Sequence, residues 1–152
     1  RRHRCREVLP VLRQHGIRSA LVDAGGDLVL GNPPPGQKGW RIEIGGSKHP
    51  DLPILELSNC AVATSGDLEQ FVEVDGKRYS HIIDPRTGIG LTTRLQVTVV
   101  TPEGMMADSL ASALNILGPA KGSAYVKTLP RVEAYFVQRK EKDTILKIAK
   151  GE

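Results

Sequence analysis

Aromatic residues are scarce in this chain, and their scarcity argues against one class of function. Phe, Trp and Tyr make up 4% of the 152 residues, so few side chains are available to stack on nucleic-acid bases. The formal net charge of +4 does not compensate, because the first 18 residues hold six arginines and one glutamate and the remaining 134 residues carry a net charge of −1. The basicity belongs to one end of the chain, and we expect no nucleic-acid partner.

Cysteine pairs, long apolar runs and targeting motifs are also lacking. Cys5 and Cys60 form no Cys-x-x-Cys motif and have no histidine at zinc-ligand spacing, so neither a disulfide framework nor a zinc site is indicated. No apolar run approaches the roughly 18 residues that cross a bilayer, and we expect no transmembrane segment. The chain does not open with Met, and its first residues already resemble the inside of a helix. We therefore expect a piece of a longer protein.

Short β-prone runs separated by turn residues make up most of the sequence. The length suits one domain with a real core, and we expect residues 1–152 to form it. The pattern predicts an α+β fold with a mixed, mostly antiparallel sheet, in which hairpins outnumber crossovers, and a few packed helices. The expected strands cover 20–22, 28–30, 40–44, 53–57, 60–63, 71–74, 77–82, 95–101, 132–138 and 144–149, and the expected helices stop at Gly16, at Gly118 and near Leu129.

Two turn-rich segments offer backbone and hydroxyl groups to a ligand. In Asp23-Ala24-Gly25-Gly26-Asp27, two residues without a Cβ let the amide groups approach a phosphate closely. The segment lacks the Gly-x-Gly-x-x-Gly spacing of a dinucleotide site, and the residues alone favour a plain tight turn over a phosphate-binding loop. Thr64-Ser65-Gly66-Asp67 ends an apolar strand with two hydroxyls and a glycine, which suit a phosphate or a flavin edge, although an ordinary strand exit is the alternative.

A third segment, His81-Ile82-Ile83-Asp84-Pro85-Arg86-Thr87-Gly88, gathers an imidazole, a carboxylate, a guanidinium and a hydroxyl. Its proline and glycine predict a loop, which follows an alternating strand. The imidazole of His81 exchanges a proton near neutral pH, and Arg86 offers a planar fork to a phosphate. A histidine alone is more often structural, so the functional interpretation rests on its neighbours.

Asp108 and Ser112 are spaced i, i+4 in a predicted helix, which puts their oxygens on one face about one turn apart. Two hard oxygen ligands suit Mg²⁺, which takes only one or two carboxylates and completes its shell with waters and phosphate oxygens. The sequence places Asp108 in the first turn, where it could instead complement the helix dipole while Ser112 fills the surface.

Taken in this order, the segments resemble the FAD:protein FMN transferases, the ApbE-type flavin transferases. The resemblance runs from about Ser19 to Val137. It is carried by Ala20-Leu21-Val22-Asp23-Ala24-Gly25-Gly26-Asp27, Ala63-Thr64-Ser65-Gly66-Asp67, the segment from His81 to Gly88, and Ala107-Asp108 through Gly118.

The resemblance implies Mg²⁺-dependent transfer of the FMN portion of FAD to a Thr or Ser hydroxyl of a target protein, with AMP as the leaving group. Asp108 and Ser112 match metal-ligand positions, and Ser112 stands where the family usually has Thr. His81 matches the motif histidine near the flavin and phosphates. The residues implied to line the FAD pocket are Gly25, Gly26, Asp27, Thr64, Ser65, Gly66, Arg86 and Thr87.

The family's N-terminal half, with much of the flavin and adenine pocket and an Ala-Lys-Gly turn, has no counterpart among these residues. We therefore expect the C-terminal portion of a longer transferase and an incomplete site. Two alternatives stay open: hydrolysis of FAD to FMN and AMP, and a flavin-binding or scaffold domain without turnover. Many family members are exported lipoproteins, so the resemblance implies a parent protein outside the cytoplasmic membrane.

Overall fold

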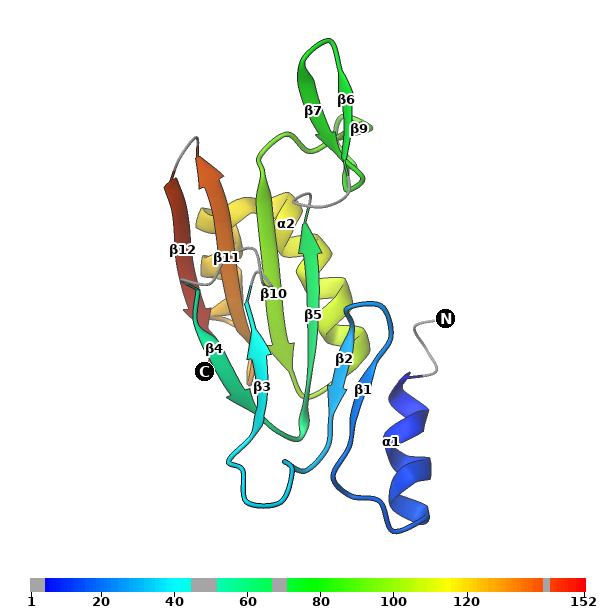
Figure 1. The fold of residues 1–152 in the computed structure, drawn as a ribbon. Helices are drawn as coiled ribbons and strands as arrows, with labels where there is room; N and C mark the ends of the chain where they lie inside the picture. Colours follow the sequence, from blue (N-terminus) through cyan, green and yellow to red (C-terminus); the bar gives the residue numbers. More distant parts are fainter. Residues whose placement is uncertain (1–4, 45–51, 67–70, 141–142) are drawn as a thin grey trace.

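A six-stranded sheet forms the centre of the protein (Figure 1). The structure, a computed structural model, describes residues 5–44, 52–66, 71–140 and 143–152. The strand order is β1-β2-β5-β10-β11-β12, and each neighbouring pair is antiparallel. The strands are β1 (Leu21–Asp23), β2 (Leu28–Leu30), β5 (Cys60–Gly66), β10 (Leu95–Thr101), β11 (Glu133–Lys140) and β12 (Asp143–Lys150). Only the isolated bridge between Ser19 and Asn32 is parallel within the described ranges, so the expected mostly antiparallel α+β fold is confirmed.

Three two-stranded ribbons accompany this sheet. They are β3 (Trp40–Glu43) with β4 (Ile54–Leu57), β6 (Phe71–Val74) with β7 (Lys77–Ser80), and β8 (Ile83–Asp84) with β9 (Ile89–Gly90). The turn between β6 and β7 has positive φ at Asp75 (49°) and Gly76 (70°). Positive φ at both central residues is the hairpin geometry that an Asp-Gly pair favours. The ribbon predicted from that pair is therefore present.

Two helices complete the fold. Helix α1 (Cys5–Gln14) is followed by Gly16 in the left-handed conformation (φ 81°), as its sequence predicts. Helix α2 (Gly104–Val126) is interrupted by non-helical backbone at Gly118 (φ 74°, ψ 172°), immediately before Pro119. The two expected helices therefore meet at a kink, because Pro119 cannot continue the hydrogen-bond ladder and Gly118 tolerates the required φ. No helix in the described part of the chain is long and apolar enough to cross a membrane.

The sheet is covered on both faces. Helix α2 packs against one face, where Ala107, Ala111 and Leu114 are fully buried against alternate residues of β5, β10 and β11. The β3–β4 ribbon lies over the other face, in front of the sheet in Figure 1, where Ile42 packs with Leu30, Val62 and Val137. The packing of α2 on β5, β10 and β11 holds the helix in a fixed position along β5.

Candidate functional site

The Asp23–Asp27 segment is the turn that joins β1 to β2. Gly25 and Gly26 have φ of 79° and 96°, which only glycine adopts readily. The Gly26 N–H donates to Asp23 Oδ1 at 2.8 Å, and the Ala24 N–H donates to the Asp27 carbonyl at 3.0 Å. The tight-turn interpretation thus accounts for two of the amides. Since Leu28 pairs with Val62 in antiparallel register, the turn extends toward the end of β5 that carries Thr64–Gly66.

Thr64, Ser65 and Gly66 belong to β5, which is longer than the sequence predicted. All three pair with β10, with Gly66 opposite Gln96. A Cβ at Gly66 would lie 2.8 Å from the Gln96 Cα, so glycine is needed there for the two strands to approach. The strand continues past Ala63 because this pairing overrides the turn preference of Ser and Gly. The fourth residue of the segment, Asp67, lies outside the described residues.

Ser65 joins two of the predicted site segments. Its Oγ lies 2.9 Å from Ser112 Oγ on α2, whereas the Thr64 Oγ1 lies 2.9 Å from Thr98 Oγ1 on β10. Successive residues of a strand point to opposite faces, so Ser65 faces the helix and Thr64 faces away from it. Only Ser65 of this pair is positioned beside the candidate metal ligands.

Helix α2 runs alongside β5, and this places Asp108 next to the same strand. Gly104 packs near Ala61, where a Cβ at Gly104 would lie 3.9 Å from the Ala61 Cβ, and Ser112 contacts Ser65. Eight helical residues rise about 12 Å and four strand residues about 13 Å. The two segments therefore span nearly the same length, and Asp108 lies on α2 between these two contacts.

Asp108 is in the second turn of α2, so its predicted place in the first turn was wrong. The helix begins at Gly104, with Glu103 as the N-cap residue and no acidic residue in its first turn. The Thr101 hydroxyl donates to the Glu103 carbonyl at 2.7 Å and accepts from the Glu103 N–H at 3.2 Å, which starts the helix early. Helix-dipole effects fall off within the first turn, so the dipole interpretation of Asp108 is weakened.

Asn115 is a site-adjacent residue that the sequence analysis missed. Its side chain is 4% exposed, and its Nδ2 donates to the carbonyls of Ser65 at 3.0 Å and Leu95 at 2.9 Å. Asn115 follows Asp108 and Ser112 at i+7 and i+3, on one stripe of the helix. A polar residue at that spacing between Leu114 and Ile116 was the signal that could have found it.

The segment from His81 to Gly88 is a loop, as predicted. Strand β7 ends at Ser80 rather than at Ile82, because the Ser80 Oγ accepts the Ile82 N–H at 3.0 Å and the chain bends there. His81 is exposed and follows the last residue of β7. The Ser80 N–H then donates to the Leu91 carbonyl at 2.7 Å, which attaches the far side of the loop to the base of the β6–β7 ribbon.

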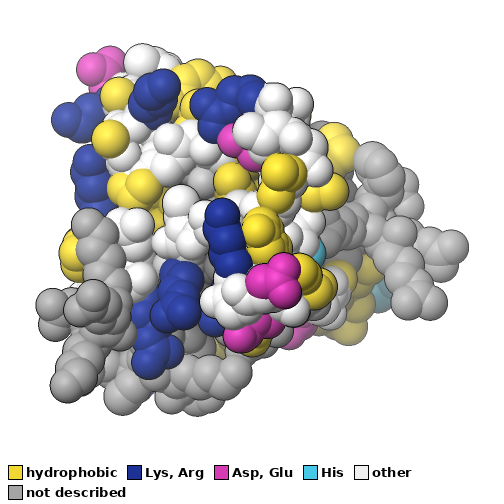
Figure 2. All heavy atoms as spheres, turned by 90° about the horizontal axis from the view of Figure 1, so that it is seen from above, with side chains coloured by type: hydrophobic (Ala, Val, Ile, Leu, Met, Phe, Trp, Pro, Cys, Tyr) yellow, Lys and Arg dark blue, Asp and Glu magenta, His cyan; other side chains and the backbone are white. Residues whose placement is uncertain are grey.

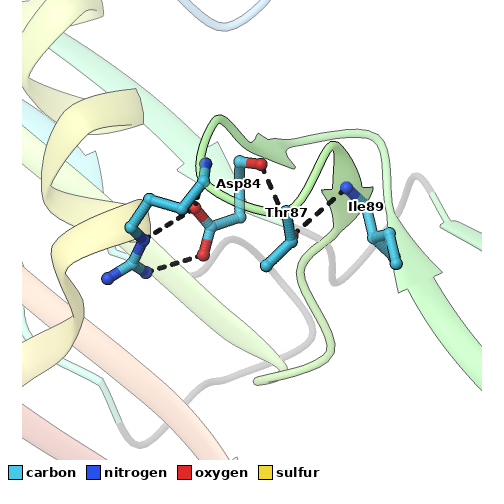
Figure 3. A network of polar contacts seen from close by, with 4 residues as sticks. Asp84, Thr87 and Ile89 are labelled. Carbon is cyan, nitrogen blue, oxygen red and sulfur yellow. Dashed lines mark hydrogen bonds and ion pairs between the residues drawn. The ribbon is translucent and has the colours of Figure 1, made fainter.

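An ion pair between Asp84 and Arg86 organises this loop (Figure 3). The Arg86 Nε and Nη2 donate to the two Asp84 oxygens at 2.9 and 2.6 Å, and the Arg86 backbone N–H donates at 3.0 Å. These bonds to the charged form lower the pKa of the Asp84 carboxyl from 3.8 to about 2. The fork of Arg86 that we expected to meet a phosphate is directed at Asp84, although the arginine side chain is 69% exposed.

Backbone bonds close the same loop around Asp84. The N–H groups of Thr87 and Gly88 donate to the Asp84 carbonyl at 3.1 and 2.8 Å, and the Ile89 N–H donates to the Thr87 Oγ1 at 3.3 Å. Gly88 has φ 69°, which explains glycine at that position. Arg86 and Thr87 therefore lie in a turn that is held by side-chain and backbone hydrogen bonds.

The loop lies at the sheet end where Ser65 contacts α2. The chain leaves β5 after Gly66 and returns at Leu95, and the β6–β7 ribbon and the loop stand beyond these strand ends in Figure 1. Figure 2 looks onto this end of the molecule and shows Lys and Arg side chains spread among hydrophobic ones. The arrangement brings the Asp23–Asp27 turn, Thr64–Gly66 and the Asp108–Ser112 stripe to one part of the sheet, with the His81 loop at the same end.

Comparisons with known proteins identify the family that this chain resembles. A family model described as "ApbE family" matches residues 4–136. Proteins named "FAD:protein FMN transferase" from Treponema pallidum (strain Nichols) and Vibrio cholerae serotype O1 are 35% and 38% identical over 144 and 124 residues, covering 86% and 77% of this chain. The chain spans only 40% and 36% of those two relatives.

Solved structures give the same result for the fold. The apo form of the flavinyl transferase ApbE from Pseudomonas stutzeri superimposes with a TM-score of 0.78 at 36% identity, covering 95% of this chain and 45% of that one. The flavin transferase ApbE from Vibrio cholerae gives a TM-score of 0.75 at 31% identity, covering 94% and 46% of the two chains. The described fold therefore corresponds to less than half of each of these proteins.

Proposed function

Since this chain belongs to the ApbE family, we propose that its protein transfers the FMN moiety of FAD to a Thr or Ser hydroxyl of a target protein, in a Mg²⁺-dependent reaction that releases AMP. The acceptor oxygen attacks the phosphorus on the FMN side of the pyrophosphate, the bond to AMP breaks, and the hydroxyl proton passes to a base. The contact between Ser65 and Ser112 is the observation that carries this proposal, because it joins the implied FAD-lining segment to the implied metal ligands.

The donor set of the proposed cation site suits Mg²⁺. Asp108 supplies a carboxylate and Ser112 a hydroxyl, both half-buried on one face of α2. Among the residues that the structure describes, no group of three His, Cys, Asp or Glu side chains is placed to hold a metal. One carboxylate with a neutral oxygen is a usual protein contribution to a Mg²⁺ site that completes its shell with phosphates and water. Bound Mg²⁺ would neutralise charge on the pyrophosphate.

The other site residues would bind and orient. The exposed imidazole of His81 would accept or donate the proton, or orient the acceptor. The Asp84–Arg86 pair would keep the loop around His81 in one conformation, with Thr87 in the same turn. Gly25, Gly26 and Asp27 would line the FAD pocket from the β1–β2 turn. We also propose, from the family resemblance alone, that the full protein acts outside the cytoplasmic membrane.

The test is mass spectrometry of an acceptor peptide incubated with the full-length protein, FAD and Mg²⁺. A covalent FMN adduct on Thr or Ser, with one AMP released per adduct, supports transfer. Adduct formation should be lost with EDTA and in Asp108→Asn, a variant that keeps the size of the side chain. Free FMN and AMP with an unmodified peptide would establish hydrolysis instead, and FAD binding without either product would indicate a binding module.

A further inference from the structure

We propose that Ser65 and Asn115 are positioning residues for the Ser112 hydroxyl. Asn115 holds the backbone of Ser65, and Ser65 Oγ accepts the proton of Ser112, which leaves the lone pairs of Ser112 for a divalent cation. The inference rests on the proposed function, because it takes Asp108 and Ser112 as the cation ligands. It assigns Ser65 to the cation site as well as to the pocket of the flavin.

The Ser112 side chain bonds in an unusual direction for a serine inside a helix. A serine inside a helix commonly bonds the carbonyl four residues earlier, and two other serines of α2 do so: Ser109 donates to Met105 and Ser123 to Pro119. Ser112 instead meets Ser65 across the helix–strand interface at 2.9 Å. The contact turns the hydroxyl toward β5 and sets its orientation.

A hydroxyl that binds a cation also has a proton to donate. A neutral hydroxyl offers two lone pairs and one proton, and when a lone pair binds a cation the proton still needs an acceptor. Ser65 Oγ is at the correct distance to be that acceptor. Such outer contacts orient the groups that touch a metal and tune its affinity.

The buried amide of Asn115 holds the backbone of Ser65 in place. A polar side chain that is 4% exposed costs stability unless it is hydrogen-bonded, and Asn115 uses its amide to bind the carbonyls of Ser65 and Leu95. These two carbonyls belong to adjacent strands, at the end of β5 and the start of β10. The amide therefore fixes the position of Ser65 relative to the helix that carries Asp108 and Ser112.

The test measures Mn²⁺ binding to the full-length protein by electron paramagnetic resonance, with and without FAD, through loss of the free-ion signal. Asn115→Leu and Ser65→Ala should each weaken Mn²⁺ binding by about 10-fold to 100-fold, the usual effect of removing an outer contact. Ser65→Thr keeps the hydroxyl and should bind as the wild type does. The double variant should lose no more affinity than the weaker-binding single variant, because both changes act through one hydroxyl.

Ser123→Ala is the matched control. Ser123 is also buried on α2 and bonds the Pro119 carbonyl at 2.6 Å, so this variant should lower thermal stability without changing Mn²⁺ affinity. Wild-type affinity in folded Asn115→Leu and Ser65→Ala would overturn the proposal. Should Asn115→Leu fail to fold, Ser65→Ala decides the question, since it removes one half-buried hydroxyl.

The outcomes separate this inference from the proposed function. Mn²⁺ binding that depends on Ser65 and Asn115, without any FMN adduct, would reject transfer and keep the positioning role. FMN transfer by the wild type, together with unchanged Mn²⁺ affinity in the variants, would support the proposed function and reject the positioning role. A wild-type protein that binds no Mn²⁺ with or without FAD would overturn the positioning role.

Discussion

Ser65 and Ser112 are 47 positions apart in the sequence, yet their Oγ atoms lie 2.9 Å from each other. The contact joins the C-terminal end of strand β5 to helix α2. It brings the segment implied to line a flavin pocket onto the stripe that carries the implied metal ligands.

Asp108→Ala should abolish Mg²⁺-dependent turnover of the full-length protein while leaving it folded. A half-buried carboxylate in the second turn of α2 contributes little to the helix dipole, so its loss should matter mainly as the loss of a cation ligand. Steady-state rates across a Mg²⁺ titration, with circular dichroism for folding, measure both effects. Ser112→Thr should be active and Ser112→Val inactive; a rate near wild type in Asp108→Ala would refute the metal assignment.

His81→Ala should slow the chemical step far more than it weakens FAD binding, by about 10²-fold to 10⁴-fold if the imidazole acts as acid or base. The residue follows β7 directly and is exposed beside the turn built on Asp84. Single-turnover rates and an FAD titration separate the two quantities. A loss well below that range in the single-turnover rate would leave His81 with an orienting role only.

Low pH should reduce the contribution of the Asp84 carboxylate to the stability of the protein. The folded-state pKa of this carboxyl is lowered from 3.8 to about 2 by its bonds to Arg86, so its stabilising contribution is complete above about pH 4 and is lost as the pH falls through 2. The difference in unfolding free energy between wild type and Asp84→Asn, measured by urea titration, should therefore shrink over that interval. Arg86→Gln removes the cause of the lowered pKa, so in that background the effect of Asp84→Asn should be small and nearly independent of pH. A difference between wild type and Asp84→Asn that is unchanged down to about pH 2 would contradict the linkage.

Gly122→Ala should destabilise the protein although alanine favours helices. The new Cβ would lie 2.9 Å from Cε1 of the buried Phe136 ring, and overpacking of this kind costs about 1–3 kcal/mol, against a gain of roughly 1 kcal/mol in helix propensity. Urea unfolding measures the net change. Gly104→Ala is the control, because its Cβ would meet Val29 at an ordinary 3.6 Å, and this variant should be neutral or stabilising.

The 152-residue chain by itself should fold cooperatively without transferring FMN. Both faces of its sheet are covered, whereas the chain spans less than half of the relatives that carry the transferase name. Calorimetry and the acceptor-peptide assay test the two parts separately. Labelling by this chain at the rate of the full-length protein would show that the site is contained between Ala20 and Gly118.

Much of the secondary structure was predictable from local sequence. Strands over 28–30, 71–74 and 95–101 were predicted at their observed bounds, since alternation and turn residues delimit them. Local signals failed for β5, which was expected to stop at Ala63. Ser65 and Gly66 favour a turn in isolation, but their pairing with β10 keeps them in the strand.

The sequence by itself determined the positions of the turns, because Asp75-Gly76, Gly88 and Gly118 accept backbone angles that most residues avoid. It also suggested most residues of the candidate site, although not Asn115. Tertiary structure alone decided which of them meet, since the β5–β10 pairing and the packing of α2 on that pair bring Ser65 to Ser112. The amide of Asn115 binds across the same junction, and no local pattern encodes a bond to carbonyls of two different strands.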